Sequence, residues 1–304
     1  MNASAQPDFR TWIEALRLRT LPLAVSVILT GSFLAAADGK ARAGVIVMAL
    51  ITTLFLQILS NLANDYGDAV KGTDNAERVG PQRTVQSGRI SARQMKSAII
   101  VFAMLSFVSG VGLLYVALGD HLVVALIFLV LGLSAIAAAI RYTTGKRAYG
   151  YKGWGDVFVF VFFGLVAVLG TYYLNTLQLK WLLLLPASAM GLLSAGVLNL
   201  NNMRDTDNDI ASGKYTLASR LGTARAKIYH AVLVISALVF TVVYVLLTYH
   251  SGWNLLFLLS LPLFFRDLVQ IFHTKEKAAL DPFLKRLALS ILLFSLLFGI
   301  GICL

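Results

Sequence analysis

The chain has 304 residues, of which 58% are hydrophobic and only 13% are charged, and its formal net charge is +11. A soluble domain carries roughly 25% charged residues, so this composition excludes a soluble protein and predicts a polytopic membrane protein. The single cysteine, Cys303, excludes a disulfide framework, and the four scattered histidines do not support a histidine metal centre.

Nine apolar segments have close to the ~20 residues that a helix needs to cross a bilayer. They occupy residues 20–37, 43–63, 96–118, 122–140, 155–174, 181–200, 228–249, 253–272 and 286–303. Short and long gaps alternate between them, and the long gaps are 64–95, 141–154, 201–227 and 273–285. All long gaps therefore belong on one side of the membrane. We expect a single all-α transmembrane domain over residues 1–304, with nine helices around a central cavity, arranged as two four-helix halves plus one helix.

Basic residues set the expected orientation. The short gaps hold only Lys40, Arg42 and Lys180, and the other lysines and arginines lie in the N-terminal tail, the long gaps or adjoining segment ends. The positive-inside rule then places the long loops and the N-terminus in the cytoplasm and the C-terminus outside. This topology and contact with anionic lipid explain the net charge. No nucleic-acid partner is expected, because the chain has no soluble basic domain, and no obligatory protein partner is indicated.

The acidic residues are concentrated in two short windows. Of the 15 acids, four lie between residues 65 and 77 and three lie between residues 205 and 209. Carboxylates are costly near a bilayer, and where they gather they usually serve an ion or a substrate. Each cluster lies at the loop side of an apolar segment, the second and the sixth, so both are expected on the same side of the membrane.

Helical spacing gives each cluster a stripe of oxygen ligands. Asn64 and Asp68 are four residues apart, and so are Asp205 and Asp209 on the sixth helix. Further candidate ligands beside these pairs are Asn61, Asp65, Asp74 and Asn202. If the two stripes face each other, they form a cage of hard oxygen donors that suits Mg²⁺ together with water and phosphate oxygens. The alternative is a set of solvated loop acids, but two clusters with the same spacing on one side argue against it.

Fixed positive charges flank the clusters. Arg83 follows the first cluster, Arg141, Lys146 and Arg147 follow the fourth segment, and Lys214 follows the second cluster. A metal ion combined with lysine and arginine is suited to binding a diphosphate and stabilising it as a leaving group. Alternatively, these basic residues only reflect the positive-inside rule. For the basic residues beside the acidic clusters, that explanation is weaker than diphosphate binding. Aromatic residues of the fifth segment could line a chamber for a lipid chain, although ordinary packing explains most of them.

At these residues the chain resembles the UbiA superfamily of intramembrane prenyltransferases, and the resemblance covers essentially the whole chain. The motifs that match are Asn-x-x-x-Asp at Asn64…Asp68, Asp-x-x-x-Asp at Asp205…Asp209, Tyr-x-x-x-Lys at Tyr142…Lys146, and the basic residue Lys214 beyond the second acidic motif. In one departure, Gly72 occupies a position where many members carry a further Asp, and the next acid is Asp74.

The sequences at 61–74, 80–83, 142–156 and 199–205 resemble the menaquinone-pathway branch of this family. The resemblance implies Mg²⁺-dependent transfer of a polyprenyl chain from polyprenyl diphosphate to 1,4-dihydroxy-2-naphthoate. Carbon dioxide and diphosphate would be lost, giving demethylmenaquinone in the bacterial inner membrane. Other acceptors of the superfamily, such as 4-hydroxybenzoate, homogentisate or haem, remain alternatives, and the sequence does not fix the length of the prenyl chain.

The resemblance also implies roles for individual residues. Two Mg²⁺ ions would bridge the diphosphate to Asn64, Asp68, Asp205 and Asp209. Direct contacts to the diphosphate would come from Arg83, Tyr142, Lys146 and Lys214. Arg141 or Arg147 would hold the carboxylate of the aromatic acceptor, and Asp156 would orient or deprotonate a ring hydroxyl. The loops at 64–95 and 201–227 would form the cytoplasmic lid of the site.

Two other classes of membrane protein fit part of this pattern. An ion-coupled transporter also uses intramembrane acids, but here the acids lie at helix ends and not at the bilayer midplane. A CDP-alcohol phosphotransferase is also Mg²⁺-dependent, but its aspartates form one continuous motif, whereas here they are divided between residues 68 and 205.

Overall fold

The computed structural model describes residues 7–75, 79–145 and 147–304. Within these ranges, nine helical spans are long and apolar enough to cross a membrane. They are Phe9–Ala37, Ala43–Val70, Ala92–Leu118, Leu122–Arg141, Gly155–Thr176, Trp181–Arg204, Leu217–Leu247, Gly252–His273 and Lys277–Cys303. The predicted all-α, nine-helix membrane architecture is therefore confirmed, and the chain is a multi-pass membrane protein.

The described residues form eighteen helical elements, of which η2 and α9 lie between spans. In chain order these are α1 (Phe9–Leu16), η1 (Leu18–Thr20), α2 (Leu21–Ala37), α3 (Ala43–Val70), α4 (Ala92–Leu118), α5 (Leu122–Arg141), η2 (Tyr149–Lys152), α6 (Gly155–Val159), η3 (Phe160–Leu169), α7 (Gly170–Thr176), η4 (Trp181–Leu183), α8 (Leu184–Arg204), α9 (Thr206–Ala211), α10 (Leu217–Leu247), η5 (Gly252–Ser260), α11 (Leu261–His273), η6 (Lys277–Leu280) and α12 (Asp281–Cys303).

Several helices extend beyond the apolar segments at the end that carries the long loops. The second span was expected to end at residue 63, but α3 continues to Val70, because its buried polar residues are covered by neighbouring loops.

The sixth span ends earlier than the predicted second acidic stripe requires. The α8 helix ends at Arg204, Asp205 lies at a break with φ −94° and ψ 7°, and Asp209 belongs to the separate helix α9. The prediction that one helix carries both aspartates is wrong, although the Asp209 N–H still donates to the Asp205 carbonyl at 2.9 Å.

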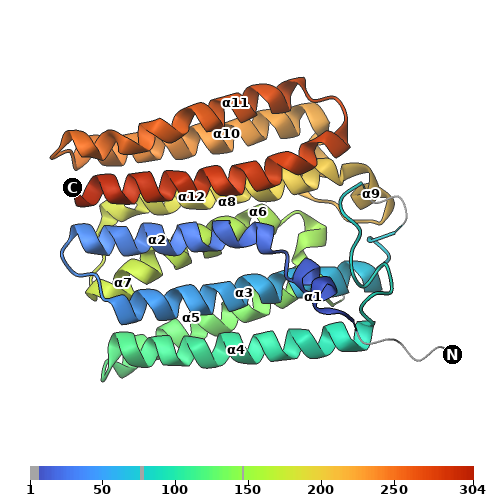
Figure 1. The fold of residues 1–304 in the computed structure, drawn as a ribbon, viewed down its shortest axis with the longest axis horizontal. Helices are drawn as coiled ribbons and strands as arrows, with labels where there is room; N and C mark the ends of the chain where they lie inside the picture. Colours follow the sequence, from blue (N-terminus) through green and yellow to red (C-terminus); the bar gives the residue numbers. More distant parts are fainter. Residues whose placement is uncertain (1–6, 76–78, 146) are drawn as a thin grey trace.

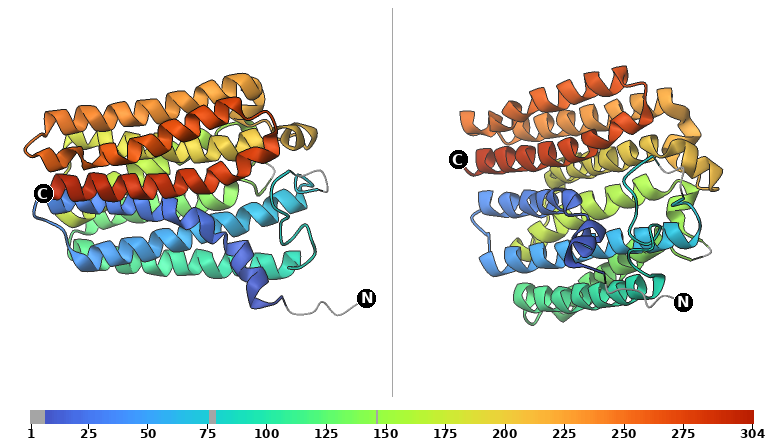
Figure 2. Two further views of the ribbon diagram at one scale, coloured as in Figure 1. Left: turned by 45° about the horizontal axis from the view of Figure 1, so that its top comes forward. Right: turned by 45° about the vertical axis from the view of Figure 1, so that its right-hand side comes forward.

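The first four spans and the next four form neighbouring groups, and the last helix packs between them. In Figure 1, α3, α4 and α5 occupy the lower part, α10 and α11 the upper part, and α12 packs along α2 and η5. The described residues of the long loops and the start of α1 lie at one end of the bundle, and the C-terminus lies at the other (Figures 1 and 2). In the part of the chain that the structure describes, the four long loops expected from the sequence therefore lie at the same end.

The fifth span is distorted where it approaches the sixth. Residues Phe160–Leu169 form a π-helix, and Gly164 in it lies directly against Gly191 of α8. A Cβ atom added at Gly164 would lie 2.7 Å from both the Ala187 carbonyl oxygen and the Gly191 Cα. Small residues at helix contacts let backbones approach closely within a membrane. This contact therefore depends on both glycines, and it fixes the cavity-lining face of η3.

A small second core anchors the first long loop. Leu59, Leu62 and Ala63 of α3 pack with Ile90 and Met95, and all five side chains are buried. The α4 helix then begins with a capping box, in which Ser91 and Gln94 satisfy each other's backbone N–H groups. The end of α3 and the loop that follows it are thereby held in one place.

Candidate active site

A cavity of about 370 Å³ runs from the loop end into the middle of the bundle. Along α3 its lining extends from Asp68 to Ala49, which at 1.5 Å per residue corresponds to about 28 Å. The polar part of the lining comprises Arg17, Thr20, Gln57, Ser60, Asn61, Asn64, Asp68, Arg83, Tyr142, Tyr149, Asn201 and Lys214. Towards the opposite end the lining is apolar, with Leu23, Val27, Ile28, Leu113, Leu114, Phe128, Phe162, Phe163 and Leu174. The cavity thus suits a ligand with a polar head and a long apolar chain.

Lys214 joins the two acidic clusters at the polar end. Its Nζ lies 3.8 Å from Asp68 Oδ2 and 3.3 Å from Asp209 Oδ1, and the three residues are buried. Burial alone would lower the pKa of Lys214, but the two carboxylates outweigh it and raise that pKa, so the ammonium stays charged. Burial raises the pKa of Asp209 to about 6, against the opposing effect of Lys214. The sequence-predicted partners from the two halves therefore meet around one buried cation.

Tyr151 was not predicted, yet it makes direct contacts at this site. Its hydroxyl donates to Asp68 Oδ1 at 2.8 Å and lies 2.6 Å from the Thr73 hydroxyl. The Lys71 Nζ stands 3.9 Å from the centre of its ring, a cation–π contact. The backbone N–H of Tyr215 also donates to the Tyr151 carbonyl at 3.1 Å. Tyr151 therefore connects three loops, and no sequence pattern marks a lone loop tyrosine as doing so.

Asp205 is held by a neighbour that the sequence reasoning did not single out. The buried Arg204 guanidinium donates through Nε to Asp205 Oδ1 at 2.8 Å and through Nη2 to Oδ2 at 2.7 Å. It also pairs with Asp281 at the start of α12 and donates to Asn201 Oδ1 at 2.9 Å. Gly80 lies over the guanidinium, since a Cβ there would be 2.7 Å from its carbon. A buried ion-pair network thus fixes Asp205.

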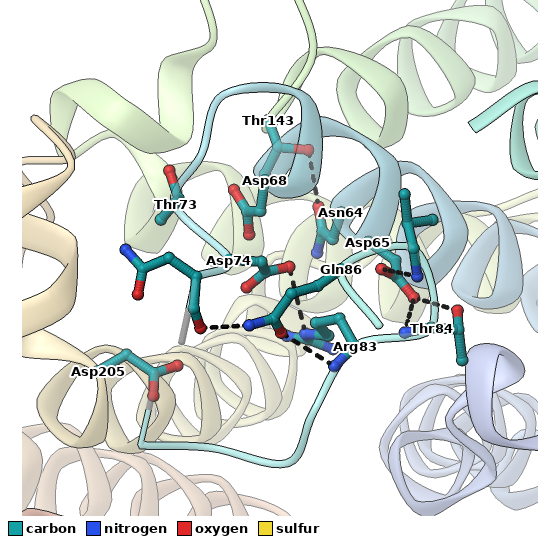
Figure 3. A network of polar contacts seen from close by, with 12 residues as sticks. Asn64, Asp65, Asp68, Thr73, Asp74, Arg83, Thr84, Gln86, Thr143 and Asp205 are labelled. Atoms are coloured by element: carbon teal, nitrogen blue, oxygen red, sulfur yellow. Dashed lines mark hydrogen bonds and ion pairs between the residues drawn. The ribbon is translucent and has the colours of Figure 1, made fainter. Parts of the chain in front are cut away.

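Two candidate ligands on α3 hold adjacent segments in place. Asp65 accepts hydrogen bonds from the Thr84 N–H at 3.2 Å, the Thr84 hydroxyl at 2.6 Å and the Val85 N–H at 3.3 Å. Asn61 donates to the Leu16 carbonyl at 2.9 Å and to Thr20 Oγ1 at 3.0 Å. Figure 3 shows the Asp65 carboxylate turned towards Thr84 and away from Asp68. We therefore leave Asp65 out of the proposed metal set.

The turn after α3 brings Asp74 back beside Asp68. Gly72 has a φ of +75°, and the Thr73 and Asp74 N–H groups both donate to the Asp68 carbonyl, at 2.9 and 3.2 Å. The Asp74 carboxylate lies 3.7 Å from the Nε of Arg83, which lines the cavity (Figure 3). The glycine that replaces a carboxylate thus permits the turn that positions the next carboxylate. The structure brings Asp74 near the site together with Arg83.

Asn64 and Tyr142 complete the polar wall. Asn64 Oδ1 lies 3.4 Å from the Thr143 hydroxyl, whose better hydrogen bond goes to the Ala63 carbonyl at 3.0 Å. Tyr142 begins a line of aromatic rings that continues into the membrane region. Successive ring centres along Tyr142, Tyr149, Phe158 and Phe162 are 5.4, 3.9 and 6.2 Å apart, and all four residues line the cavity.

The remaining sequence candidates lie elsewhere or outside the described residues. Arg141 and Arg147 are exposed and do not line the cavity. Asp156 is buried against α10, where it accepts a 3.3 Å hydrogen bond from the Tyr229 hydroxyl, and it does not line the cavity either. Lys146 is outside the described residues. The structure therefore does not place Arg141, Arg147 or Asp156 in the cavity lining.

The donor set around the second cluster fits a hard cation. Asp209 Oδ2, Asn202 Oδ1 and Asn208 Oδ1 are buried without a hydrogen-bond partner among the described residues. Such oxygens are costly unless a cation or a ligand donor meets them. In the described part of the chain, no three acidic, histidine or cysteine side chains are grouped closely enough to hold a metal by themselves. This pattern matches Mg²⁺, which completes its shell with water and substrate phosphate oxygens.

Paired carboxylates, a buried lysine and an arginine at the mouth of a long apolar cavity define a membrane enzyme for substrates with a charged head and a lipid chain. The chain belongs to the UbiA prenyltransferase family, whose model matches residues 24–301. It is a prenyltransferase, so the transporter and CDP-alcohol phosphotransferase alternatives are set aside.

Relatives and solved structures cover nearly the whole chain. Over 294 residues it is 46% identical to 1,4-dihydroxy-2-naphthoate octaprenyltransferase of Escherichia coli (strain K12), with 96% of this chain and 95% of the relative covered. The apo structure of a UbiA homologue from Aeropyrum pernix K1 has a TM-score of 0.68 at 16% identity, covering 94% and 98%. A UbiA homologue from Archaeoglobus fulgidus, bound to DMAPP and Mg²⁺, has a TM-score of 0.59 at 19% identity, also covering 94% and 98%. These two structures establish the fold.

Proposed function

We propose that the protein transfers a polyprenyl group from polyprenyl diphosphate to 1,4-dihydroxy-2-naphthoate, with release of diphosphate and carbon dioxide. The observation that carries the proposal is Lys214, buried between Asp68 and Asp209 at the polar end of a long apolar cavity. The 46% identity to a relative of that name supports the choice of acceptor.

The headgroup of the donor would lie at the polar end. Lys214 and Arg83 both line the cavity, and their positive charges are suited to bind diphosphate oxygens and to stabilise the leaving group. Their carboxylate partners hold them in position before substrate arrives, which limits reorganisation during the reaction. Tyr142 lies in the same wall and can donate its hydroxyl.

A cation would share this site with the headgroup. Asp68, Asp209, Asn64 and Asn202 are the residues we propose to hold it, with Asp74 and Asp205 as further candidate ligands. When bound, Mg²⁺ would neutralise the diphosphate and weaken its bond to the allylic carbon. The structure of the Archaeoglobus relative with DMAPP and Mg²⁺ is consistent with this proposal.

In the proposed reaction, the prenyl donor and the aromatic acceptor each lose one bond and together form a new carbon–carbon bond. The allylic carbon–oxygen bond breaks and its electron pair leaves with the diphosphate. The ring carbon that carries the carboxylate attacks the allylic carbon through its π electrons. The carbon–carboxylate bond then breaks, carbon dioxide leaves, and its electron pair restores the aromatic ring, giving the quinol form of demethylmenaquinone. The apolar cavity excludes water, which would otherwise capture the allylic cation.

We also propose that the polar end faces the cytoplasm of a bacterium, with the protein in the inner membrane. The loop end carries Arg83, Arg89, Arg141 and Arg147, and the opposite end carries few basic residues. The positive-inside rule supports this orientation.

A single assay tests the reaction and the acceptor together. The protein in nanodiscs is incubated with Mg²⁺, octaprenyl diphosphate and either 1,4-dihydroxy-2-naphthoate, 4-hydroxybenzoate or homogentisate, and products are identified by mass. We expect a product equal to prenylated naphthoate minus carbon dioxide. Turnover restricted to another acid, or a product that retains the carboxylate, would contradict the proposal.

A further inference from the structure

The segment 80–85 of the first long loop is anchored at both ends, and Arg83 lies between the anchors. At one end, Thr84 donates its N–H and its hydroxyl to the Asp65 carboxylate at 3.2 and 2.6 Å, and the Val85 N–H donates to the same carboxylate at 3.3 Å. Thr84 and Asp65 are both buried, and Figure 3 shows this contact beside Arg83. This end of the segment is therefore fixed to the side of α3.

The other end of the segment lies against Arg204. A Cβ atom added at Gly80 would be 2.7 Å from the guanidinium carbon and from Nη2 of Arg204, and 2.9 Å from its Nε. Cβ atoms essentially never come within 3.0 Å of such neighbours. The φ of Gly80 lies outside the left-handed region, so the backbone conformation does not call for glycine. What this position requires is therefore the absence of a side chain.

The guanidinium of Arg204 is held too firmly to make room for a side chain at Gly80. It donates to the two oxygens of Asp205 at 2.8 and 2.7 Å, donates to Asn201 Oδ1 at 2.9 Å and pairs with Asp281. The Arg204 side chain is also fully buried. Moving it would leave buried charges unpaired, which is strongly destabilising. A larger residue at position 80 would therefore displace the segment and leave the guanidinium in place.

The displacement would reach Arg83, because the segment is short. Gly80 and Thr84 are four residues apart, which corresponds to about 14 Å at full extension. The ring of Pro81 locks its φ at about −65°, so fewer torsions remain to absorb a shift. Arg83 lines the cavity, with its Nε 3.7 Å from Asp74 Oδ2. A shift at Gly80 therefore changes where this cation stands at the polar end.

We propose that Gly80 is a positioning residue for diphosphate binding. Its lack of a side chain lets the segment 80–85 rest on the Arg204 guanidinium, and this placement brings Arg83 to the polar end of the cavity. The inference rests on the proposed function, since it concerns the diphosphate subsite of that reaction. Because Arg204 also holds Asp205, one buried side chain supports groups of both acidic clusters.

The test measures binding of inorganic diphosphate in the presence of Mg²⁺ by titration calorimetry, with the protein in nanodiscs. Gly80→Ala should weaken binding about fivefold or more, and Arg83→Gln roughly tenfold or more. The double variant should bind within about twofold of Arg83→Gln, because the segment no longer carries the cation that the alanine displaces. Gly252→Ala is the matched control, since a Cβ there meets no heavy atom within 4 Å and the φ of Gly252 is not left-handed.

The kinetic signature is a difference between the two substrates. In the prenyl transfer assay, Gly80→Ala should raise the KM for octaprenyl diphosphate about fivefold or more and leave the KM for 1,4-dihydroxy-2-naphthoate within about twofold. A purely structural defect would reduce the amount of active enzyme, and hence the apparent kcat, without this difference.

Each failure has a distinct signature. Wild-type affinity for diphosphate in Gly80→Ala would overturn the positioning role. Multiplied losses in the double variant would also overturn it, because Gly80 would then act independently of Arg83. Recovery of Gly80→Ala by excess Mg²⁺ would place the defect at Asp205 instead, and would overturn it as well. If diphosphate binds in the expected order of variants but the naphthoate is not prenylated, the proposed reaction fails while the role of Gly80 stands.

Discussion

The Tyr151 hydroxyl donates a 2.8 Å hydrogen bond to Asp68, so a loop between the fourth and fifth spans holds a carboxylate of the second span. Asp68 also faces Lys214 from the second half of the chain. One side chain of the first cluster is therefore oriented by two other parts of the protein. The carboxylate is pre-positioned, which is what electrostatic stabilisation of a leaving group requires.

Replacing Tyr151 by phenylalanine should impair turnover without unfolding the protein. Hydrogen bonds to charged groups contribute about 1.5–3 kcal/mol, which corresponds to roughly a tenfold or larger loss of kcat/KM. Initial rates are measured over a range of Mg²⁺ and octaprenyl diphosphate concentrations. Tyr215→Phe is the control, because Tyr215 is exposed. Equal rates for the two variants would show that Tyr151 does not position Asp68.

The acidic residues should differ sharply in their effect on activity. Asp68→Ala and Asp209→Ala each remove a carboxylate that contacts Lys214, and prenyl transfer should fall at least a thousandfold while membrane insertion persists. Asp207→Ala is the matched control in the same cluster, because Asp207 is exposed and pairs with Lys277 on the surface. Product formation is followed by mass in isolated membranes. Near-normal turnover by Asp68→Ala or Asp209→Ala would remove these residues from the site.

Arg204 should matter chiefly for stability. Arg204→Met would leave Asp205 without its bidentate partner, and breaking a buried ion pair typically costs about 3–5 kcal/mol. A marked fall in the thermal unfolding temperature in detergent is expected. Arg89→Met breaks a partly exposed pair with Glu14 and should change stability by about 1 kcal/mol or less. Similar unfolding temperatures for both variants would contradict a structural role for the buried network.

Removal of divalent cations should stop the reaction and leave the fold intact. Asp68, Asp205 and Asp209 already have cationic protein partners, so folding does not depend on a metal to neutralise them. Excess EDTA should abolish prenyl transfer, and added Mg²⁺ should restore it. The unfolding temperature, measured in parallel without substrate, should shift by no more than a few degrees. A large loss of stability would instead indicate a structural ion.

The helical architecture was predictable because length and apolar content alone determine which segments cross a bilayer. The ends of the helices were less predictable. Polar residues such as Asn64 and Asp68 continue α3 because neighbouring loops cover them. The hydropathy of the sequence carries no information about such tertiary contacts. In the sixth span, spacing correctly related Asp205 to Asp209, but the break between α8 and α9 has no signal in that spacing.

The acidic motifs were informative about the site, while the loops were not. Asp65 and Asp68 are both candidate ligands by sequence, yet Asp65 binds the loop at Thr84 and Val85 while Asp68 lines the cavity. Spacing describes a face of a helix and not the segment that folds over it. Tyr151 and Arg17 carry no periodic pattern, so only the tertiary structure reveals their positions.

The pairing of Arg204 with Asp281 has a consequence for how the protein is made. Asp281 is the first residue of α12, which is synthesised after Arg204, and it also pairs with Arg19 in the first span. Until that helix is inserted, Arg204 lacks one of its two carboxylates and the first and last spans are not joined. A chain into which α12 has not yet been inserted therefore holds an incomplete ion-pair network at the headgroup end.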